Sequence, residues 1–141
     1  MMLVKQLSVF MENRPGRLYK LTNALGKEGI DFVTLSIADT KDFGIVRFIA
    51  RDNERAYEIL KKEGFTVGIT ELIGVEVEDK PNALAEVVAL MEQENINIEY
   101  LYSFVLTNHN SAKILMRVNE TERAVGLLEE KGIKMLSEKI L

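Results

Sequence analysis

The residues that could do chemistry in this chain of 141 residues gather around two short, similar loops. Glu12–Gly16 carries a carboxylate, an amide, a guanidinium, a proline and a glycine, and Glu78–Asn82 has Asp79 and Lys80 in place of the amide and the guanidinium. Outside these loops, the chain has few side chains that are suited to catalysis. The absence of cysteine and the single histidine, His109, exclude disulfides, thiolate metal sites, cysteine nucleophiles and histidine-rich metal clusters. Most hydrolase and metalloenzyme templates are thereby excluded, and we expect neither a metal nor another cofactor.

The overall composition is that of an ordinary soluble globular protein. The formal net charge is -4, with 47% hydrophobic and 28% charged residues. No window approaches the roughly 18 consecutive apolar residues that a membrane span needs. Met1–Lys5 also lacks the basic-then-apolar build of a signal peptide. We therefore expect a cytoplasmic protein with no membrane partner, and the mildly acidic balance argues against a nucleic acid partner.

The two loops belong to an internal repeat. A shift of 66 positions superposes Glu12–Leu18 on Glu78–Leu84 and aligns the only two prolines of the chain. After a slip of two residues, an offset of 68 superposes Glu54–Ala56 on Glu122–Ala124. The two extra residues fall in a polar segment, Thr107–Ser111, which we interpret as a lengthened hairpin loop. The repeat predicts two modules in place of the single domain that the chain length suggests.

Each predicted module, residues 1–70 and residues 71–141, contains the same series of elements. Alternating apolar residues predict strands, and apolar residues at helical spacing predict helices. In the first module these are strand Lys5–Met11, a helix from about Leu18 that ends before a left-handed Gly29, strands Ile30–Ala38 and Ile45–Arg51, helix Asp52–Glu63 and strand Phe65–Ile69. In the second they are strand Leu72–Val77, helix Asn82–Gln93, strands Ile96–Val105 and Ala112–Val118, helix Glu120–Lys131 and strand Ile133–Leu136.

Two helix starts carry capping signals. Asp52 is predicted to cap the second helix of the first module, and Asn119 with Glu122 is predicted to form a capping box in the second module.

The order strand, helix, strand, strand, helix, strand is the ferredoxin-like arrangement. The predicted fold class is therefore α+β, with two ferredoxin-like βαββαβ modules in tandem, each an antiparallel sheet with its helices on one face. This fold serves metal carriers, RNA binders, acylphosphatases and regulatory domains. A metal carrier needs a cysteine pair, and an RNA binder needs several ring side chains where the predicted central strands offer one Phe and two Arg. An acylphosphatase-like enzyme is disfavoured because the second module has Lys80 and Ala83 in place of Arg14 and Arg17.

At the two proline loops the chain resembles the ACT domain family, small-molecule regulatory modules that commonly sense amino acids. The resemblance covers essentially the whole chain as two consecutive modules. Its most specific stretch, Glu12–Leu18 followed by Gly29–Phe32, is similar to the serine-binding regulatory domain of phosphoglycerate dehydrogenases. It implies a non-catalytic protein, dimeric with a second copy of itself, that binds a free amino acid between two adjacent modules. Because the two modules use every residue, we expect it to act on a separate metabolic enzyme or regulator.

The resemblance also implies which residues bind the ligand. In that family the amino acid is held by the residue two before the proline, by the opening of the second strand and by main-chain groups of the loop. The matching positions are Asn13, Arg14, Pro15, Gly16, Asp31 and Phe32 in the first module, and Asp79, Asn82, Asn97 and Ile98 in the second. At the residue two before the proline and at the opening of the second strand, each module thus offers one Asn and one Asp, in opposite order, to the ammonium and carboxylate of an amino acid.

Two other interpretations stay open. Asn13 and Asp79 could serve only as caps of the first helix of each module. Alternatively, the modules could form a structural protein–protein interaction or dimerisation unit with a vestigial ligand site. The replacement of Gly16 by Asn82 in the second loop favours the first loop as the binding loop, since Asn shares only part of the conformational freedom of Gly.

Overall fold

The computed structural model describes residues 2–39, 42–105 and 110–137. The chain divides into two compact units: Lys5–Thr70, called here the N-terminal unit, and Met1–Val4 with Glu71–Leu141, called the C-terminal unit. One strand, β4 (Thr66–Glu78), belongs to both units. The prediction of two separate strands in this stretch is wrong, because Thr70 and Glu71 form no turn and the extended backbone continues through them.

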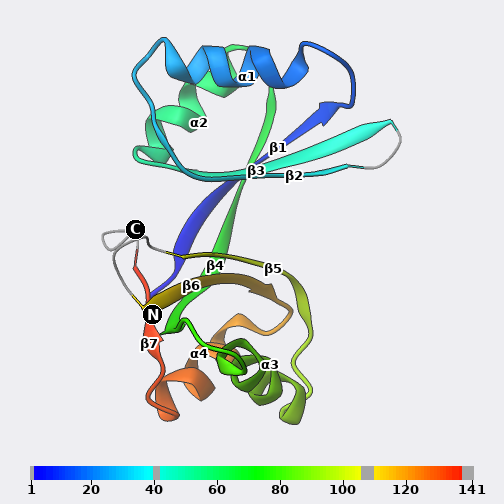
Figure 1. The fold of residues 1–141 in the computed structure, drawn as a ribbon. Coiled ribbons are helices and arrows are strands. Elements are labelled where there is room, and N and C mark those ends of the chain that lie inside the picture. Colours follow the sequence, from blue (N-terminus) through cyan, green and yellow to red (C-terminus); the bar gives the residue numbers. More distant parts are fainter. Residues whose placement is uncertain (1, 40–41, 106–109, 138–141) are drawn as a thin grey trace. The chain divides into compact units, whose positions relative to one another are not determined.

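The N-terminal unit confirms the predicted ferredoxin-like module. Its strand order is β2-β3-β1-β4, and β3 pairs antiparallel with both β1 and β2. Figure 1 shows both helices of the unit on one face of this sheet. The elements are β1 (Val4–Glu12), α1 (Arg17–Gly26), β2 (Phe32–Asp39), β3 (Phe43–Ala50), α2 (Asn53–Lys62) and the first residues of β4.

The core of the N-terminal unit lies between the helices and the sheet. Strand residues two apart and helix residues three or four apart bring their apolar side chains to this one layer, which is why each element has a single buried face. Fully buried side chains in this layer include Leu7, Val9, Leu21, Leu25, Phe48 and Leu60.

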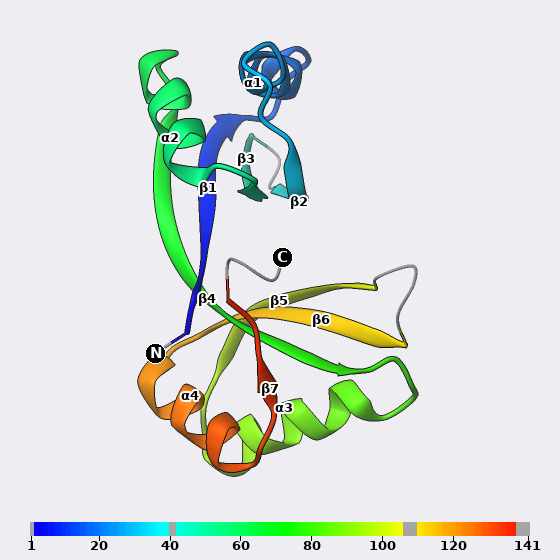
Figure 2. The same ribbon diagram turned by 90° about the vertical axis from the view of Figure 1, so that its left-hand side faces the viewer.

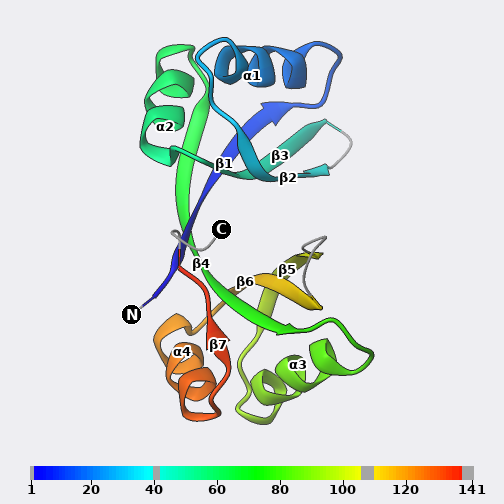
Figure 3. The same cartoon turned by 60° about the vertical axis from the view of Figure 1, so that its left-hand side comes forward.

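The C-terminal unit repeats the arrangement with the order β5-β6-β4-β7. Its helices lie on one face of its sheet (Figure 2), and β7 lies beside β4 (Figure 3). The elements after β4 are α3 (Ala83–Gln93), β5 (Ile98–Val105), β6 (Ser111–Val118), α4 (Thr121–Glu130) and β7 (Lys134–Met135). Its core includes Ile73, Val75, Val87, Met91, Met116 and Leu128.

The two predicted helix caps have different outcomes. The Asp52 cap is confirmed, since its Oδ1 accepts the backbone N–H of Arg55 at 3.1 Å. The capping box at Asn119 is wrong. Glu120 is the N-cap of α4 and makes no side-chain capping bond. The side chain of Asn119 is engaged elsewhere, because its Oδ1 accepts the backbone N–H of Asn97 at 2.9 Å.

Most of the predicted long hairpin loop, Thr107–Ser111, lies outside the described residues, and so does His109. In the part of the chain that the structure describes, every helix is too short or too polar to cross a membrane.

Candidate ligand-binding site

The two proline loops have the same backbone in both units. The N–H of Asn13 donates to the carbonyl of Asp42 at 2.9 Å, and the N–H of Asp79 donates to the carbonyl of Asn110 at 2.8 Å. Each bond ties the residue after the first strand to the residue that precedes the third strand of the unit, as the register of the repeat requires. The loops are therefore held in place by the hairpin end of their own sheet.

A left-handed residue then starts the first helix of each unit. Gly16 precedes α1 with φ 90° and ψ -19°, and Asn82 precedes α3 with φ 76° and ψ -12°. These two residues are the N-caps, and neither makes a side-chain capping bond. Asn13 and Asp79 lie three residues earlier, so neither is the N-cap of its helix. Because Asn82 follows the same path as Gly16, the replacement by itself does not distort the second loop.

The charged residues of the loops form exposed ion pairs with the end of the preceding strand. Nε of Arg14 lies 3.2 Å from Glu12 Oε2, and Nζ of Lys80 lies 3.1 Å from Glu78 Oε2. Such pairs contribute little to stability. Pro15 is exposed in the turn between Arg14 and the helix.

The predicted residues at the strand openings divide into exposed and packed ones. Asp31 and Asn97 are exposed, and their carbonyls accept the backbone N–H groups of Arg51 at 3.0 Å and Asn119 at 3.1 Å. Within the described residues, no side-chain hydrogen bond or ion pair engages the carboxylates of Asp31 and Asp79. Both carboxylates are therefore available as acceptors for a cationic group.

Phe32 and Ile98 also contribute to the packing of their units. The ring of Phe32 packs edge-on against Phe48 with the centroids 5.2 Å apart, and Ile98 packs against the core of the C-terminal unit. Both side chains are half-buried, so their contribution to a ligand site is limited to the exposed part of the side chain and to the backbone.

The structure does not bring the two halves of the predicted site together within one unit. Glu12, just before the first loop, pairs with Phe43 at the start of β3, whereas Phe32 pairs with Ala50 at its end. The seven residue steps between those partners correspond to about 24 Å of strand. A single amino acid cannot span that distance between its ammonium and its carboxylate.

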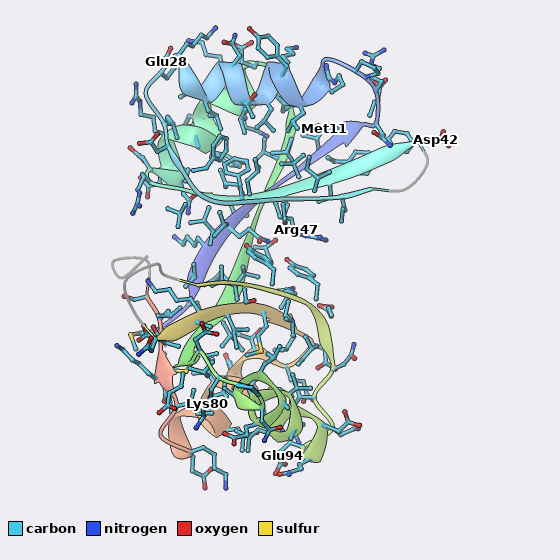
Figure 4. The ribbon with its side chains drawn as sticks, in the orientation of Figure 1. Met11, Glu28, Asp42, Arg47, Lys80 and Glu94 are labelled. Carbon is cyan, nitrogen blue, oxygen red and sulfur yellow. The ribbon has the colours of Figure 1, made fainter. Side chains whose placement is uncertain are left out.

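The same separation is visible in Figure 4, where Asp42 and Glu28 mark opposite ends of the N-terminal unit. Asp42 is the residue that holds the loop, and Glu28 lies just before the opening of β2. In the C-terminal unit, likewise, Glu78 pairs with Ser111 at the start of β6 and Ile98 pairs with Val118 at its end.

Sequence reasoning missed a polar network beside the second loop. Nζ of Lys134 lies 2.6 Å from Glu76 Oε2, and the hydroxyl of Ser111 donates to Glu76 Oε1 at 3.1 Å. The hydrogen bond from Lys134 lowers the pKa of Glu76, against the opposing effect of burial, and Ser111 lowers it further. The equivalent positions of the N-terminal unit hold Phe10 and Phe43, whose rings stack with centroids 5.1 Å apart. The repeat itself contained the signal, because it aligns Glu76 with Phe10, a carboxylate with an apolar ring.

No cluster of three or more His, Asp or Glu side chains suited to a metal ion occurs among residues 2–39, 42–105 and 110–137.

Two βαββαβ units with one repeated loop between first strand and first helix define a tandem of ferredoxin-like modules. The family model described as an ACT domain pair matches residues 2–141, and the chain belongs to this family. An ACT domain pair supports a regulatory, ligand-binding role in general.

Solved structures agree with this assignment. Protein BT0572 from Bacteroides thetaiotaomicron is 39% identical, with 97% of this chain and 94% of that chain covered and a TM-score of 0.91. The regulatory subunit of aspartate kinase from Thermus thermophilus is 16% identical over 89% of this chain and 90% of that chain, with a TM-score of 0.59. The corresponding subunit from Thermus flavus is 17% identical over 89% and 88%, with a TM-score of 0.60. These two share the fold. A comparison with curated proteins gives no match.

Proposed function

We propose that this protein is a non-catalytic regulator that binds a free amino acid and passes the signal to a separate metabolic enzyme or regulator. The observation that carries the proposal is the repeated loop, in which the same backbone hydrogen bond and the same left-handed residue precede a helix in both units. The names of the aspartate kinase regulatory subunits, which share the fold, are consistent with this role.

The chemistry of the loop suits an amino acid. The first N–H groups of a helix have no partner within the helix, so the start of α1 after Gly16 can receive a carboxylate. An ammonium needs acceptors, and the carboxylate of Asp31 or the amide oxygen of Asn13 can supply them. None of these groups contacts the side chain of the ligand. The site therefore recognises the ammonium and carboxylate that all amino acids share.

We propose further that each site is completed by a second copy of the chain. Within one unit the loop and the strand opening are about 24 Å apart along β3, so one ligand needs the loop of one module and the strand opening of another. In the N-terminal unit these would be Asn13 of one copy and Asp31 of the other. In the C-terminal unit they would be Asp79 and Asn97. Each site then contains one carboxylate and one amide.

The free edge of β2 is consistent with such pairing. Among the described strands, β2 is hydrogen-bonded only to β3, so its other edge is unpaired. Leu35 and Ile37 on this strand are 43% and 51% exposed. An unpaired edge with exposed apolar side chains is a template for another strand.

The direct test is a thermal-shift screen of the intact protein against each of the twenty amino acids at millimolar concentration. A ligand that binds only the folded state raises the melting temperature by mass action. We expect at least one amino acid to do so, and expect Asn13→Ala and Asp31→Ala to reduce the shift. Asn23→Ala, which removes an exposed amide from α1, the helix between these two residues in the sequence, is the matched control and should leave the shift intact. A flat response to all twenty would contradict amino-acid binding.

The exposed edge of β2 also favours a second candidate, a protein–protein interaction module with a vestigial ligand site. Its test is an affinity purification without added small molecules. Recovery of one constant partner, lost on Ile37→Glu but unaffected by Asn13→Ala, would support this function over amino-acid sensing.

A further inference from the structure

The C-terminal unit has a surface pocket beside the second proline loop, and Glu78 and Lys80 of that loop belong to its lining. Its volume is about 340 Å³, within the size range of small-molecule sites. It lies between the end of β4, the first turn of α3 and the residues that lead into β7. Its apolar floor is formed by Val77, Ala83, Val87 and Ile133.

The repeat shows what occupies the corresponding space in the N-terminal unit. There the guanidinium carbon of Arg17 lies 5.3 Å from the centroid of the Phe65 ring, and Nζ of Lys20 lies 5.4 Å from the same centroid. Nε of Arg17 is fully buried and has no hydrogen-bond partner among the described residues. A cation on an apolar stem therefore already fills this space in one of the two units.

Three replacements distinguish this region of the C-terminal unit from its equivalent in the N-terminal unit. Ala83 stands where the first unit has Arg17, Ile133 stands where it has Phe65, and Glu86 stands where it has Lys20. The first two remove the guanidinium and the ring, so that the half-buried side chains of Val77 and Ile133 line the pocket above the buried Ala83 and Val87. The third changes the sign of the charge at the rim from positive to negative.

Of the charged side chains at the rim, Glu86 is the one carboxylate that is not paired with a lysine. Lys80 pairs with Glu78 at 3.1 Å, and Lys134 pairs with Glu76 at 2.6 Å. Glu86 is exposed, and in the part of the chain that the structure describes no ion pair engages it. The rim therefore has a net charge of about -1, which favours a cation.

We propose that this pocket binds a small organic cation, a guanidinium or ammonium group on a short apolar stem. The stem would lie on Val77 and Ile133, and the cation would face Glu86. The bound cation would thus occupy the space that the side chain of Arg17 fills in the N-terminal unit. The pocket includes Glu78 and Lys80 of the second proline loop, and the proposal does not depend on amino-acid binding at the first loop.

The probe is the n-butylguanidinium ion, titrated into the intact protein labelled with ¹⁵N. Saturable changes are expected in the amide signals of Ala83, Glu86 and Ile133, with the signals of Gly16 and Asp31 unmoved. Neutral n-butanol and anionic butyrate at equal concentration should produce no saturation. Changes absent, scattered over the molecule, or equally strong with butanol would overturn the proposal.

Two variants localise the site. Ala83→Arg restores the filling seen in the N-terminal unit and should weaken binding at least about tenfold. Ala89→Arg places the same charge on an exposed position of the same helix and should leave binding within about twofold.

Glu86→Gln tests the charge at an exposed position that folding tolerates, so it keeps the proposal testable if Ala83→Arg is unstable. Loss of one screened ion pair should weaken binding about twofold to fivefold. Unchanged affinity in Glu86→Gln, or wild-type affinity in a folded Ala83→Arg, would exclude the assignment.

Discussion

Gly16 and Asn82 occupy the same left-handed backbone conformation at equivalent helix starts, with φ values of 90° and 76°. Gly29 and Asn95 repeat the relationship after the helices, at 74° and 55°. Asparagine is one of the few non-glycine residues that visit this region routinely. The second module has thus replaced glycine twice without changing the course of its backbone.

This conformation predicts a stability difference between Gly16, which precedes α1, and Gly26, the last residue of α1. Gly16→Ala should lower the free energy of unfolding by about 1–2 kcal/mol, because Ala is strained at positive φ although nothing lies within 4 Å of its added Cβ. Gly26→Ala, equally open but helical, should raise it by about 0.5–1 kcal/mol. Urea denaturation of both variants measures the two values. Equal effects of the two substitutions would show that the positive φ at Gly16 imposes no measurable strain on alanine.

Much of the fold was predictable from the sequence because the periodic apolar residues act locally. Each helix and nearly every strand has one face that the alternation identifies, and the repeat allowed each element to be checked against its copy. The errors lie where tertiary partners decide. Asn119 carries an ordinary capping signal, but its side chain is taken up by the N–H of Asn97, a residue far along the chain.

The sequence predicted which residue types the candidate site contains, but not how far apart they lie in the folded unit. Asn13 and Asp31 are near in sequence, yet β1 and β2 run parallel on either side of β3, so the loop and the strand opening lie at opposite ends of the sheet. The pocket at Ala83 and Ile133 was missed because it arises from what two side chains leave empty, which no single residue pattern signals.

Close packing at Gly74 provides a second stability prediction. A Cβ added there would lie 2.9 Å from Leu136 Cβ and 3.2 Å from Val4 Cγ2. Gly74→Ala should therefore lower the free energy of unfolding by about 1–3 kcal/mol through overpacking. Gly126→Ala, on α4 in open space, is the control and should raise it by about 0.5–1 kcal/mol. A neutral Gly74→Ala in denaturant melts would mean that the backbone at Leu136 shifts to admit the added methyl group without loss of stability.

The Glu76 network predicts a dependence of stability on pH. The hydrogen bond from Lys134 holds the pKa of Glu76 below its ordinary value of 4.5 in the folded state. A lowered folded-state pKa gives stability that is fully present above the unfolded-state pKa and lost as the pH falls through the folded-state value. Lys134→Met should raise the pKa of Glu76 and destabilise the protein at pH 7, with the difference from wild type shrinking on acidification below about pH 4.

The measurement is an NMR titration of the Glu76 carboxyl carbon together with denaturant melts at several pH values. Lys131→Met removes an exposed lysine of the same segment that makes no ion pair within the described residues, and should change neither quantity. An unmoved Glu76 pKa in Lys134→Met would contradict the assigned cause.

The two-copy site predicts complementation between defective chains. If Asn13 of one copy and Asp31 of the other hold one ligand, Asn13→Ala and Asp31→Ala proteins should each bind poorly alone. After the two are unfolded and refolded together, half of the dimers contain one chain of each kind. Every such dimer has one site with both residues intact and one with neither, so about a quarter of the wild-type N-terminal sites should return. Isothermal titration with the amino acid found by the thermal-shift screen counts them.

The control is the double variant Asn13→Ala/Asp31→Ala refolded with Asn13→Ala, where no combination of chains contains an intact site and no binding should return. A site built within one unit would give no recovery in either mixture, because each chain would carry its own defect. Recovery in the first mixture alone would establish that the 24 Å between loop and strand opening is bridged by pairing of two chains.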